Sequence, residues 1–321
     1  MTRYCDAHIH LSHSMEPVFA ESEQYFCVTS CHSKEEFESL GRYLPSGRSD
    51  YPHFRYSLHS SASLRNASGG ATIPTAKEQL IDGTPRQNHR FCRDSLKTCL
   101  AGFAPSGRSL PTAEVTSMVF ASYGIHPQSP ALRDKTFIEK ELSFIENLLA
   151  EKKIIAIGEC GFDFFTPEFK STAPEQEIVF NEQLFLAQKY NVPIVLHLRK
   201  SIEKIFTYSR ELKKLPAVIF HSFPGTLREA QSLQNHGINA FFSFGKPILN
   251  GKKASIDCVQ NLPIQNILFE TDATYQTLKD EKETLPSDIK KVYQRACELR
   301  GLSIEDLCEK IFINFKSALN L

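Results

Sequence analysis

Two histidines near the start of the chain, His8 and His10 in the run DAHIH, have clear chemical potential. In a β-strand, the side chains of residues i and i+2 point to the same side, so both imidazoles can reach one metal ion. Neutral imidazole is a good ligand for zinc, manganese, nickel and iron. A lone His-x-His pair is equally compatible with a structural role, so its meaning depends on the residues that accompany it.

Four further polar residues stand at the ends of apolar runs. A carboxylate at the end of a buried strand is costly to desolvate unless it is paired or bound to a metal. Histidines at matching places in two successive strand–helix units indicate a shared site rather than two separately packed side chains. The four residues are His197 after PIVL, His221 after AVIF, Glu159 after IIAIG, and Asp272 after ILFET.

Together these positions supply four imidazoles and two carboxylates, which is enough for two divalent ions with Glu159 as the bridge. Two ions about 3.5–4 Å apart can stabilise both the attacking and the leaving oxygen of a hydrolysis. The sequence contains neither Gly-x-Ser-x-Gly nor Gly-x-Gly-x-x-Gly, so metal-activated water is the simplest nucleophile. We expect Asp272 and Glu159 to be catalytic, with Asp272 as the general base that takes a proton from that water.

Two nearby residues are candidates for holding a substrate. His126 lies in the run YGIHP, where Pro127 disfavours a helix; it is a phosphate contact, a metal ligand or a turn residue. Arg199 follows His197 by two positions and should point the same way, where a guanidinium suits an anionic substrate. A structural salt bridge is the alternative role for Arg199. The remaining histidines, among them His32, do not end a predicted strand, and we expect them to be surface or structural residues.

The elements that must position these residues alternate along the chain. Strands in alternation with helices predict a parallel sheet of the α/β class, and eight strands indicate a closed (β/α)8 TIM-type barrel. The carboxyl ends of all strands would then meet at one rim, where barrel enzymes place their active sites. Strands are predicted at 4–8, 25–29, 116–124, 154–159, 193–197, 217–221, 240–243 and 266–270, and helices at 136–152, 175–190, 201–212, 226–236, 287–300 and 303–311.

Residues 41–112 interrupt this alternation. They are rich in Ser, Arg, Gly and Pro and contain ten Lys or Arg against four Asp or Glu, a net charge of +6. A structureless connection of this length is rare inside a compact core. We therefore predict one barrel over 1–321, interrupted after its second strand by a basic, poorly ordered insertion at 41–112. This insertion is either a mobile surface segment or a basic flap that attracts a polyanion.

The composition excludes several classes of protein. Lys and Arg together number 37, as do Asp and Glu, which argues against a wholly basic nucleic-acid coat protein. No apolar run approaches the roughly 20 residues of a membrane-spanning helix, and the N-terminus lacks an apolar signal core. The nine cysteines include no Cys-x-x-Cys pair, which favours reduced thiols over disulfides or a zinc ribbon. We expect a cytoplasmic protein with no membrane association.

These motifs, in this order, resemble the TatD family of metal-dependent deoxyribonucleases, within the amidohydrolase-like metallohydrolases. The resemblance implies a (β/α)8 barrel, a phosphate contact at His126, and metal ligands at the six strand-end positions, which are His8, His10, Glu159, His197, His221 and Asp272. It covers residues 1–30 and 115–321 and rests on the segments 6–11, 124–127, 157–163, 176–187, 197–199, 221–226 and 270–273.

The residues and the resemblance together favour a hydrolase of phosphodiester bonds, in DNA or another phosphodiester substrate, that uses one or two divalent ions (Mg, Mn or Zn). An amidohydrolase acting on a small amide, ester or lactone would use the same ligands, but no strand-end lysine is aligned for a carbamate bridge. A non-catalytic binding protein that retains the barrel is the third hypothesis, and the intact set of ligands weighs against it. The sequence identifies no protein partner.

Overall fold

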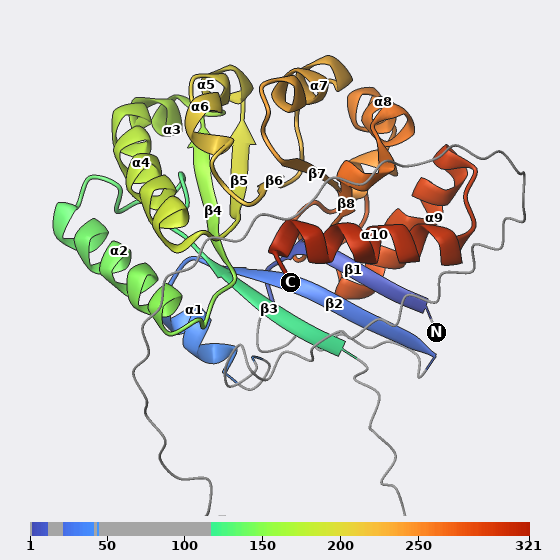
Figure 1. The fold of residues 1–321 in the computed structure, drawn as a ribbon, viewed down its shortest axis with the longest axis horizontal. Helices are drawn as coiled ribbons and strands as arrows, with labels where there is room; N and C mark the ends of the chain where they lie inside the picture. Colours follow the sequence, from blue (N-terminus) through green and yellow to red (C-terminus); the bar gives the residue numbers. More distant parts are fainter. Residues whose placement is uncertain (1, 12–21, 42–43, 45–116) are drawn as a thin grey trace, which may run out of the picture. The chain divides into compact units, whose positions relative to one another are not determined.

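The computed structural model describes residues 2–11, 22–41, 44 and 117–321. Within them, eight parallel strands form one sheet in chain order, which confirms the predicted barrel (Figure 1). The predicted insertion at 41–112 lies outside the described residues, apart from Gly41 and Leu44. The strands are β1 Thr2–Ile9, β2 Glu23–Cys31, β3 Ser117–Tyr123, β4 Ala156–Asp163, β5 Ile194–Arg199, β6 Val218–Phe220, β7 Ala240–Phe244 and β8 Ile267–Phe269.

Helices follow most of the strands, as the sequence predicts. The predicted helix at 201–212 is two short helices, and the last helix continues to Leu319 rather than ending at Ile311. The helices are α1 Lys34–Ser39, α2 Lys135–Ala150, α3 Pro167–Ser171, α4 Ala173–Tyr190, α5 Ile202–Phe206, α6 Ser209–Leu212, α7 Leu227–Asn235, α8 Lys253–Asn261, α9 Ile289–Arg300 and α10 Ile304–Leu319, with 3-10 turns at η2 Lys246–Ile248, η3 Ile264–Asn266 and η4 Pro286–Asp288.

The last helix, α10, packs against the first strands of the barrel (Figure 1). It begins where the Ser303 side chain accepts a hydrogen bond from the backbone of Asp306, a favourable N-cap. Its buried face places the ring of Phe312 4.9 Å from that of Phe26 in β2. The carboxyl end of the chain therefore covers the outer side of the strands that carry the first candidate ligands.

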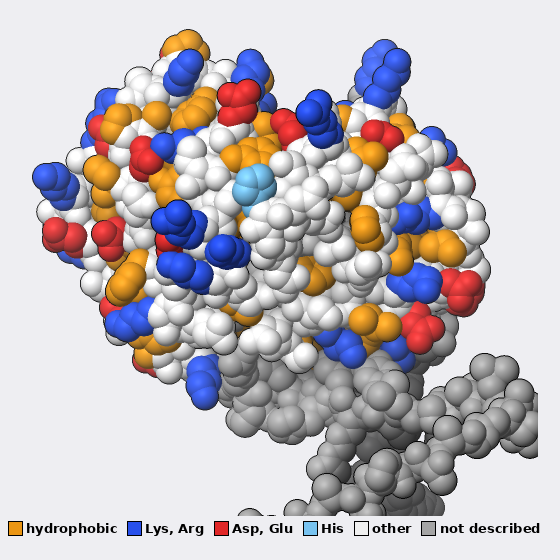
Figure 2. All heavy atoms as spheres, turned by 45° about the horizontal axis from the view of Figure 1, so that its top comes forward, with side chains coloured by type: hydrophobic (Ala, Val, Ile, Leu, Met, Phe, Trp, Pro, Cys, Tyr) orange, Lys and Arg blue, Asp and Glu red, His pale blue; other side chains and the backbone are white. Residues whose placement is uncertain are grey.

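The surface of the described residues is mixed in character. On the face drawn in Figure 2, hydrophobic side chains are scattered among basic, acidic and other polar ones rather than gathered into one broad apolar area. Such scattered apolar side chains are normal for a protein surface. Among the described residues, no helix combines the length and the hydrophobicity that crossing a membrane requires.

The barrel closes between β1 and the segment that follows β8. The backbone N–H of Asp272 donates to the carbonyl of His8 at 3.0 Å, and the N–H of His10 donates to the carbonyl of Ala273 at 2.8 Å. These two hydrogen bonds place the first predicted ligands beside the last one.

A tyrosine from α9 also holds β1, where the barrel closes. The hydroxyl of Tyr293 accepts a hydrogen bond from the backbone N–H of Cys5 and donates one to the carbonyl of the same residue, both at 3.0 Å. Tyr293 and Cys5 are fully or almost fully buried. One side chain thus satisfies two backbone groups of β1 that water cannot reach.

Replacement of Tyr293 by Phe should destabilise the barrel by about 1–3 kcal/mol, because it leaves buried backbone groups unpaired. Urea unfolding of the full chain measures this loss. Tyr190→Phe is the matched control: its hydroxyl bonds Glu146 near the surface, so we expect a change within about 0.5 kcal/mol. Equal losses of stability in both variants would contradict a special role for the hydrogen bonds of Tyr293.

Candidate metal centre

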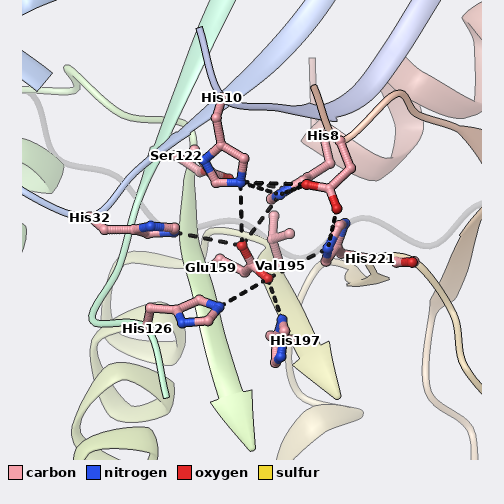
Figure 3. Close-up of polar contacts among 12 residues, drawn as sticks. His8, His10, His32, Ser122, His126, Glu159, Val195, His197 and His221 are labelled. Carbon is pink, nitrogen blue, oxygen red and sulfur yellow. Dashed lines mark hydrogen bonds and ion pairs between the residues drawn. The ribbon is translucent and has the colours of Figure 1, made fainter. Parts of the chain in front are cut away.

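Glu159 lies at the centre of the carboxyl-terminal rim, with imidazoles around it (Figure 3). Its side chain is almost fully buried. Its Oε2 faces Nε2 of His8 (3.3 Å), His10 (3.7 Å) and His32 (3.6 Å), and its Oε1 faces Nδ1 of His197 (2.6 Å) and Nε2 of His126 (3.3 Å) and His221 (3.5 Å). The carboxylate therefore stands between two groups of imidazoles, which suits a bridge between two ions.

Two glycines in β4 allow Glu159 to reach this position. Gly158 and Gly161 have φ angles of +142° and +134°, in the region that favours glycine. A Cβ atom would lie 2.5 Å from the Val195 carbonyl oxygen at Gly158, and 2.3 Å from the His197 carbonyl oxygen at Gly161. The glycines thus permit a close approach of β4 to β5, which brings Glu159 against His197.

His8, His10 and Asp272 form one group of converging donors. Nε2 of His8 lies 3.2 Å from Nε2 of His10, and Oδ1 of Asp272 lies 3.7 Å and 3.6 Å from these two nitrogens. Two ligands of a tetrahedral zinc ion, each about 2.0–2.1 Å from the metal, lie about 3.3 Å apart. The spacing and the chemistry of these donors fit a divalent cation.

Three of the histidines are also held at their other ring nitrogen. Such outer hydrogen bonds fix the ring orientation and the tautomer of metal-binding histidines. None of the three partner residues was assigned a role from the sequence, because only the fold brings them to the rings. His8 Nδ1 pairs with Ser30 Oγ at 3.2 Å, His197 Nε2 with Asp163 Oδ2 at 3.1 Å, and His221 Nδ1 with Glu270 Oε2 at 3.1 Å.

Burial and neighbouring charges set the protonation of the centre. Burial lowers the pKa of His10 well below its usual range and that of His126 to about 4, so both rings are neutral near pH 7. Burial alone would raise the pKa of Glu159, but the imidazoles of His126 and His221 hold that pKa well below its usual range. Burial alone would lower the pKa of His221, but the carboxylates of Glu270, Glu159 and Asp272 raise it to about 10, and Glu159 and Asp163 likewise raise the pKa of His197. A metal ion that binds these two rings would therefore displace protons from them.

The hydrogen bonds of His126 indicate the tautomer of its ring. Its Nδ1 accepts a hydrogen bond from the backbone N–H of Gln128 at 3.1 Å. A neutral ring that accepts at Nδ1 carries its proton on Nε2, which faces Glu159 as a donor. A protonated Nε2 has no lone pair for a metal, although His126 also converges with Glu159 and His197 in a cluster that could hold an ion in the other tautomer.

His32 reaches the centre, although its sequence context predicts a surface or structural role. The predicted strand ended at Thr29, whereas β2 continues to Cys31 and His32 follows directly. Its backbone N–H donates to Oε2 of Glu36 at 2.8 Å, and Ser33 caps α1 by accepting from the N–H of Glu36. Ser33 and Glu36 have the Ser-x-x-Glu spacing of a helix start, and this pattern could have indicated that the strand ends just before Ser33.

Arg199 lies at the mouth of a cavity of about 630 Å³. Its guanidinium carbon lies 3.6 Å from the ring centroid of Phe165, which preorganises the side chain. Within the part of the chain that the structure describes, no ion pair includes Arg199, so the salt-bridge alternative gains no support there. Other residues that line this cavity are His10, His126, Lys252, Asp272 and Tyr275.

A parallel eight-stranded barrel that gathers histidines and carboxylates at its carboxyl-terminal rim has the architecture of a metal-dependent hydrolase. The model of the family described as TatD related DNase matches residues 76–320, and the chain belongs to this family of hydrolases. The matched region contains six of the eight predicted site residues and leaves out His8 and His10.

Individual relatives agree with this assignment. The chain is 32% identical to the uncharacterized metal-dependent hydrolase YabD of Bacillus subtilis over 206 residues, which is 62% of this chain and 77% of that protein. It is 30% identical to the 3'-5' ssDNA/RNA exonuclease TatD of Escherichia coli K12 over 198 residues, which is 58% and 72% of the two chains. The crystal structure of YJJV, a TatD homologue from Escherichia coli K12, superposes on this chain with a TM-score of 0.57 and 24% sequence identity. The superposition covers 63% of this chain and 77% of that one, and this similarity supports the fold.

Replacement of Glu270 by Gln should weaken metal binding by about 10–100-fold, because it loosens the orientation of His221. Competition titrations of Zn²⁺ and Mn²⁺ against a chromophoric chelator measure the affinity. Glu298→Gln, which alters an exposed ion pair with Arg295, is the matched control and should bind as the wild type does. Unchanged affinity in correctly folded Glu270→Gln would show that His221 does not depend on Glu270.

Proposed function

We propose that this protein hydrolyses phosphodiester bonds in single-stranded nucleic acid, with DNA as the first substrate to test. The observation that carries the proposal is the cluster around Glu159, which lies beside the N–H donor of His126 and opens into a cavity with a cationic rim. Similarity to a protein named as an exonuclease of single-stranded DNA and RNA supports the class of substrate.

The donor set suits one or two divalent ions, and Mg²⁺, Mn²⁺ and Zn²⁺ are the candidates. Bound ions supply Lewis-acid activation of water and neutralise charge that develops on the phosphate oxygens. The residues proposed to hold them are His8, His10, Glu159, His197, His221 and Asp272, which include two clusters with donor atoms within 4.8 Å of one another.

Asp272 is the proposed general base. Its Oδ1 is directed toward His8 and His10, and its Oδ2 accepts a hydrogen bond from the side-chain amide of Gln276 at 2.8 Å. The amide orients the carboxylate and leaves Oδ2 a further lone pair. We assign Oδ2 as the atom that accepts the proton of the attacking water.

The phosphate group is held from the opposite side of the cavity. His126 is the proposed hydrogen-bond donor through Nε2–H, and Arg199 the proposed cation. A guanidinium already stacked on a ring loses little freedom when it binds phosphate. Tyr275 lines the cavity, is 61% exposed and offers a ring face for a nucleotide base, while Phe165, 45% exposed, stacks on Arg199 beside it. Stacking of this kind tolerates any base sequence and requires unpaired bases, which favours single strands.

The amidohydrolase alternative finds no additional support in the described residues. Lys246 lies just after β7 and lines the cavity. Its ammonium group contacts Glu281 and lies 2.8 Å from Asp288. A lysine held as a cation between two carboxylates is not available as a carbamate bridge.

The direct test treats the protein with a chelator, restores Mg²⁺, Mn²⁺ or Zn²⁺ singly, and supplies labelled single-stranded DNA, single-stranded RNA, and a panel of small amides, esters and lactones. We expect metal-dependent cleavage of the nucleic acids. Cleavage of a small ester or amide alone would support the amidohydrolase hypothesis instead. No turnover with any metal would support the non-catalytic one.

Combined replacement of His8 and His10 by Ala should abolish hydrolysis while the barrel stays folded, because the variant lacks two of the imidazoles that face Oε2 of Glu159. Elemental analysis, circular dichroism and the oligonucleotide assay measure metal content, folding and activity. His236→Ala, which removes an exposed imidazole, should behave as the wild type. Wild-type activity in the double variant would overturn the assignment of these ligands.

Asp272→Asn should lose activity by on the order of 10²–10⁴-fold and lose much less metal, because Asn keeps the shape and one oxygen but cannot take a proton. Turnover and metal content are measured on the same preparation. Asp257→Asn is a control on an exposed carboxylate that bonds Asn261. Near-normal turnover in Asp272→Asn would show that another group accepts the proton.

A further inference from the structure

His32 brings an additional imidazole to the centre, and the resemblance to the family gives it no role. Its Nε2 is shielded from solvent and has no hydrogen-bond partner, although it lies 3.6 Å from Oε2 of Glu159. A buried polar atom without a partner is costly, and in native proteins it points to a missing ion, water or ligand. The ring of His32 is therefore positioned for something that binds at the centre.

The environment of His32 places it on the substrate side. Its ring centroid lies 4.9 Å from that of His126, and the two rings face the two oxygens of Glu159 (Figure 3). Both histidines border the 630 Å³ cavity and a second one of about 270 Å³, which Gln128 and Ser129 also line. His32 and His126 are thus neighbours that face open space together.

The local backbone explains why the ring points inward without being fixed by a bond of its own. Glu36 and Ser33 hold the turn from β2 into α1 through backbone hydrogen bonds of 2.8 Å and 3.1 Å. The first of these bonds uses the backbone N–H of His32, and neither involves its Nε2. The side chain is positioned in advance and pays little reorganisation when a ligand arrives.

A metal-ligand role is less suitable for His32. On the Oε2 side of Glu159, His8, His10 and Asp272 already bring the number of converging donors to four. A catalytic ion needs an open position for water or substrate, which a further protein ligand would fill. His126, the nearest ring on the cavity side, is itself an N–H donor rather than a lone-pair donor toward Glu159.

We propose that His32 and His126 act as a pair of imidazole donors that hold two oxygens of one substrate phosphate beside Glu159. The inference rests on the proposed function, because a phosphodiester is the substrate that brings this phosphate. It adds His32 as a binding residue and makes the phosphate contact two-sided. Donors fixed on two sides of a phosphate determine its orientation as well as its affinity.

The test uses inorganic phosphate as the probe and the metal-loaded full chain. Phosphate affinity is measured by isothermal titration calorimetry, and metal content by elemental analysis, for wild type, His32→Ala, His32→Gln and the control His236→Ala. We expect His32→Ala to keep its metal and bind phosphate roughly 10–100-fold more weakly, as for loss of a hydrogen bond to a charged group. His32→Gln, whose amide N–H reaches the place of Nε2, should regain part of the affinity, and His236→Ala should match the wild type.

Unchanged phosphate affinity in both His32 variants would overturn the proposal, and so would a wild type that binds no phosphate. A loss of metal in parallel with the loss of phosphate would identify His32 as a ligand instead. If His32→Ala does not fold, His32→Gln and His32→Asn decide together. Affinity near that of the wild type in His32→Gln with a loss in His32→Asn, whose amide is too short to reach, supports the contact, and equal affinity in these two variants overturns it. Phosphate binding requires no cleavage, so a protein that binds phosphate through His32 but leaves nucleic acid intact would contradict only the proposed function.

Discussion

The candidate metal centre depends on the hydrogen bonds that the buried carboxylate of Asp6 accepts. This carboxylate accepts hydrogen bonds from the Thr271 hydroxyl (2.6 Å), the Thr271 backbone N–H (3.0 Å) and the Tyr25 hydroxyl (2.9 Å). Burial raises the pKa of Asp6 to about 7, and these donors oppose that rise. The carboxylate joins β1 to the segment after β8, so it sets the register in which His8 meets Asp272. A shift of β1 by one residue would turn the side chains of His8 and His10 away from Asp272.

Rigid support recurs around the centre, although each element provides it differently. Glycines let β4 approach β5, while Ser30, Asp163 and Glu270 hold the far nitrogens of three histidines. Such outer contacts hold donors in place before any ion or substrate arrives, and this preorganisation is what makes electrostatic stabilisation effective. The converging donors of the rim are therefore a property of the whole barrel, not of the short motifs that contain them.

The sequence predicts the barrel and the strand-end residues because both depend on local pattern. Apolar runs identify all eight strands, and their ends lead to Glu159, His197 and His221. The prediction fails for His32 because β2 runs two residues beyond its apolar stretch, and strand ends depend on pairing with β3, which the pattern does not contain. The hydrogen bonds of Asp163 to His197 and of Glu270 to His221 are not predictable for a similar reason, since these partners are distant in the chain.

A second buried charged side chain organises the cavity, as Asp6 organises the converging donors. Lys246, almost fully buried after β7, contacts Glu281 and Asp288 and so ties the chain beyond β8 to the barrel. That stretch carries Gln276, which orients Asp272, and Tyr275, which is exposed at the cavity mouth. A buried ion pair of this kind contributes less to stability than to choosing one arrangement among several. Strand-borne residues thus supply the converging donors, while a loop held by Lys246 presents Tyr275 and Gln276 at the cavity, and such loops are where members of one fold differ in specificity.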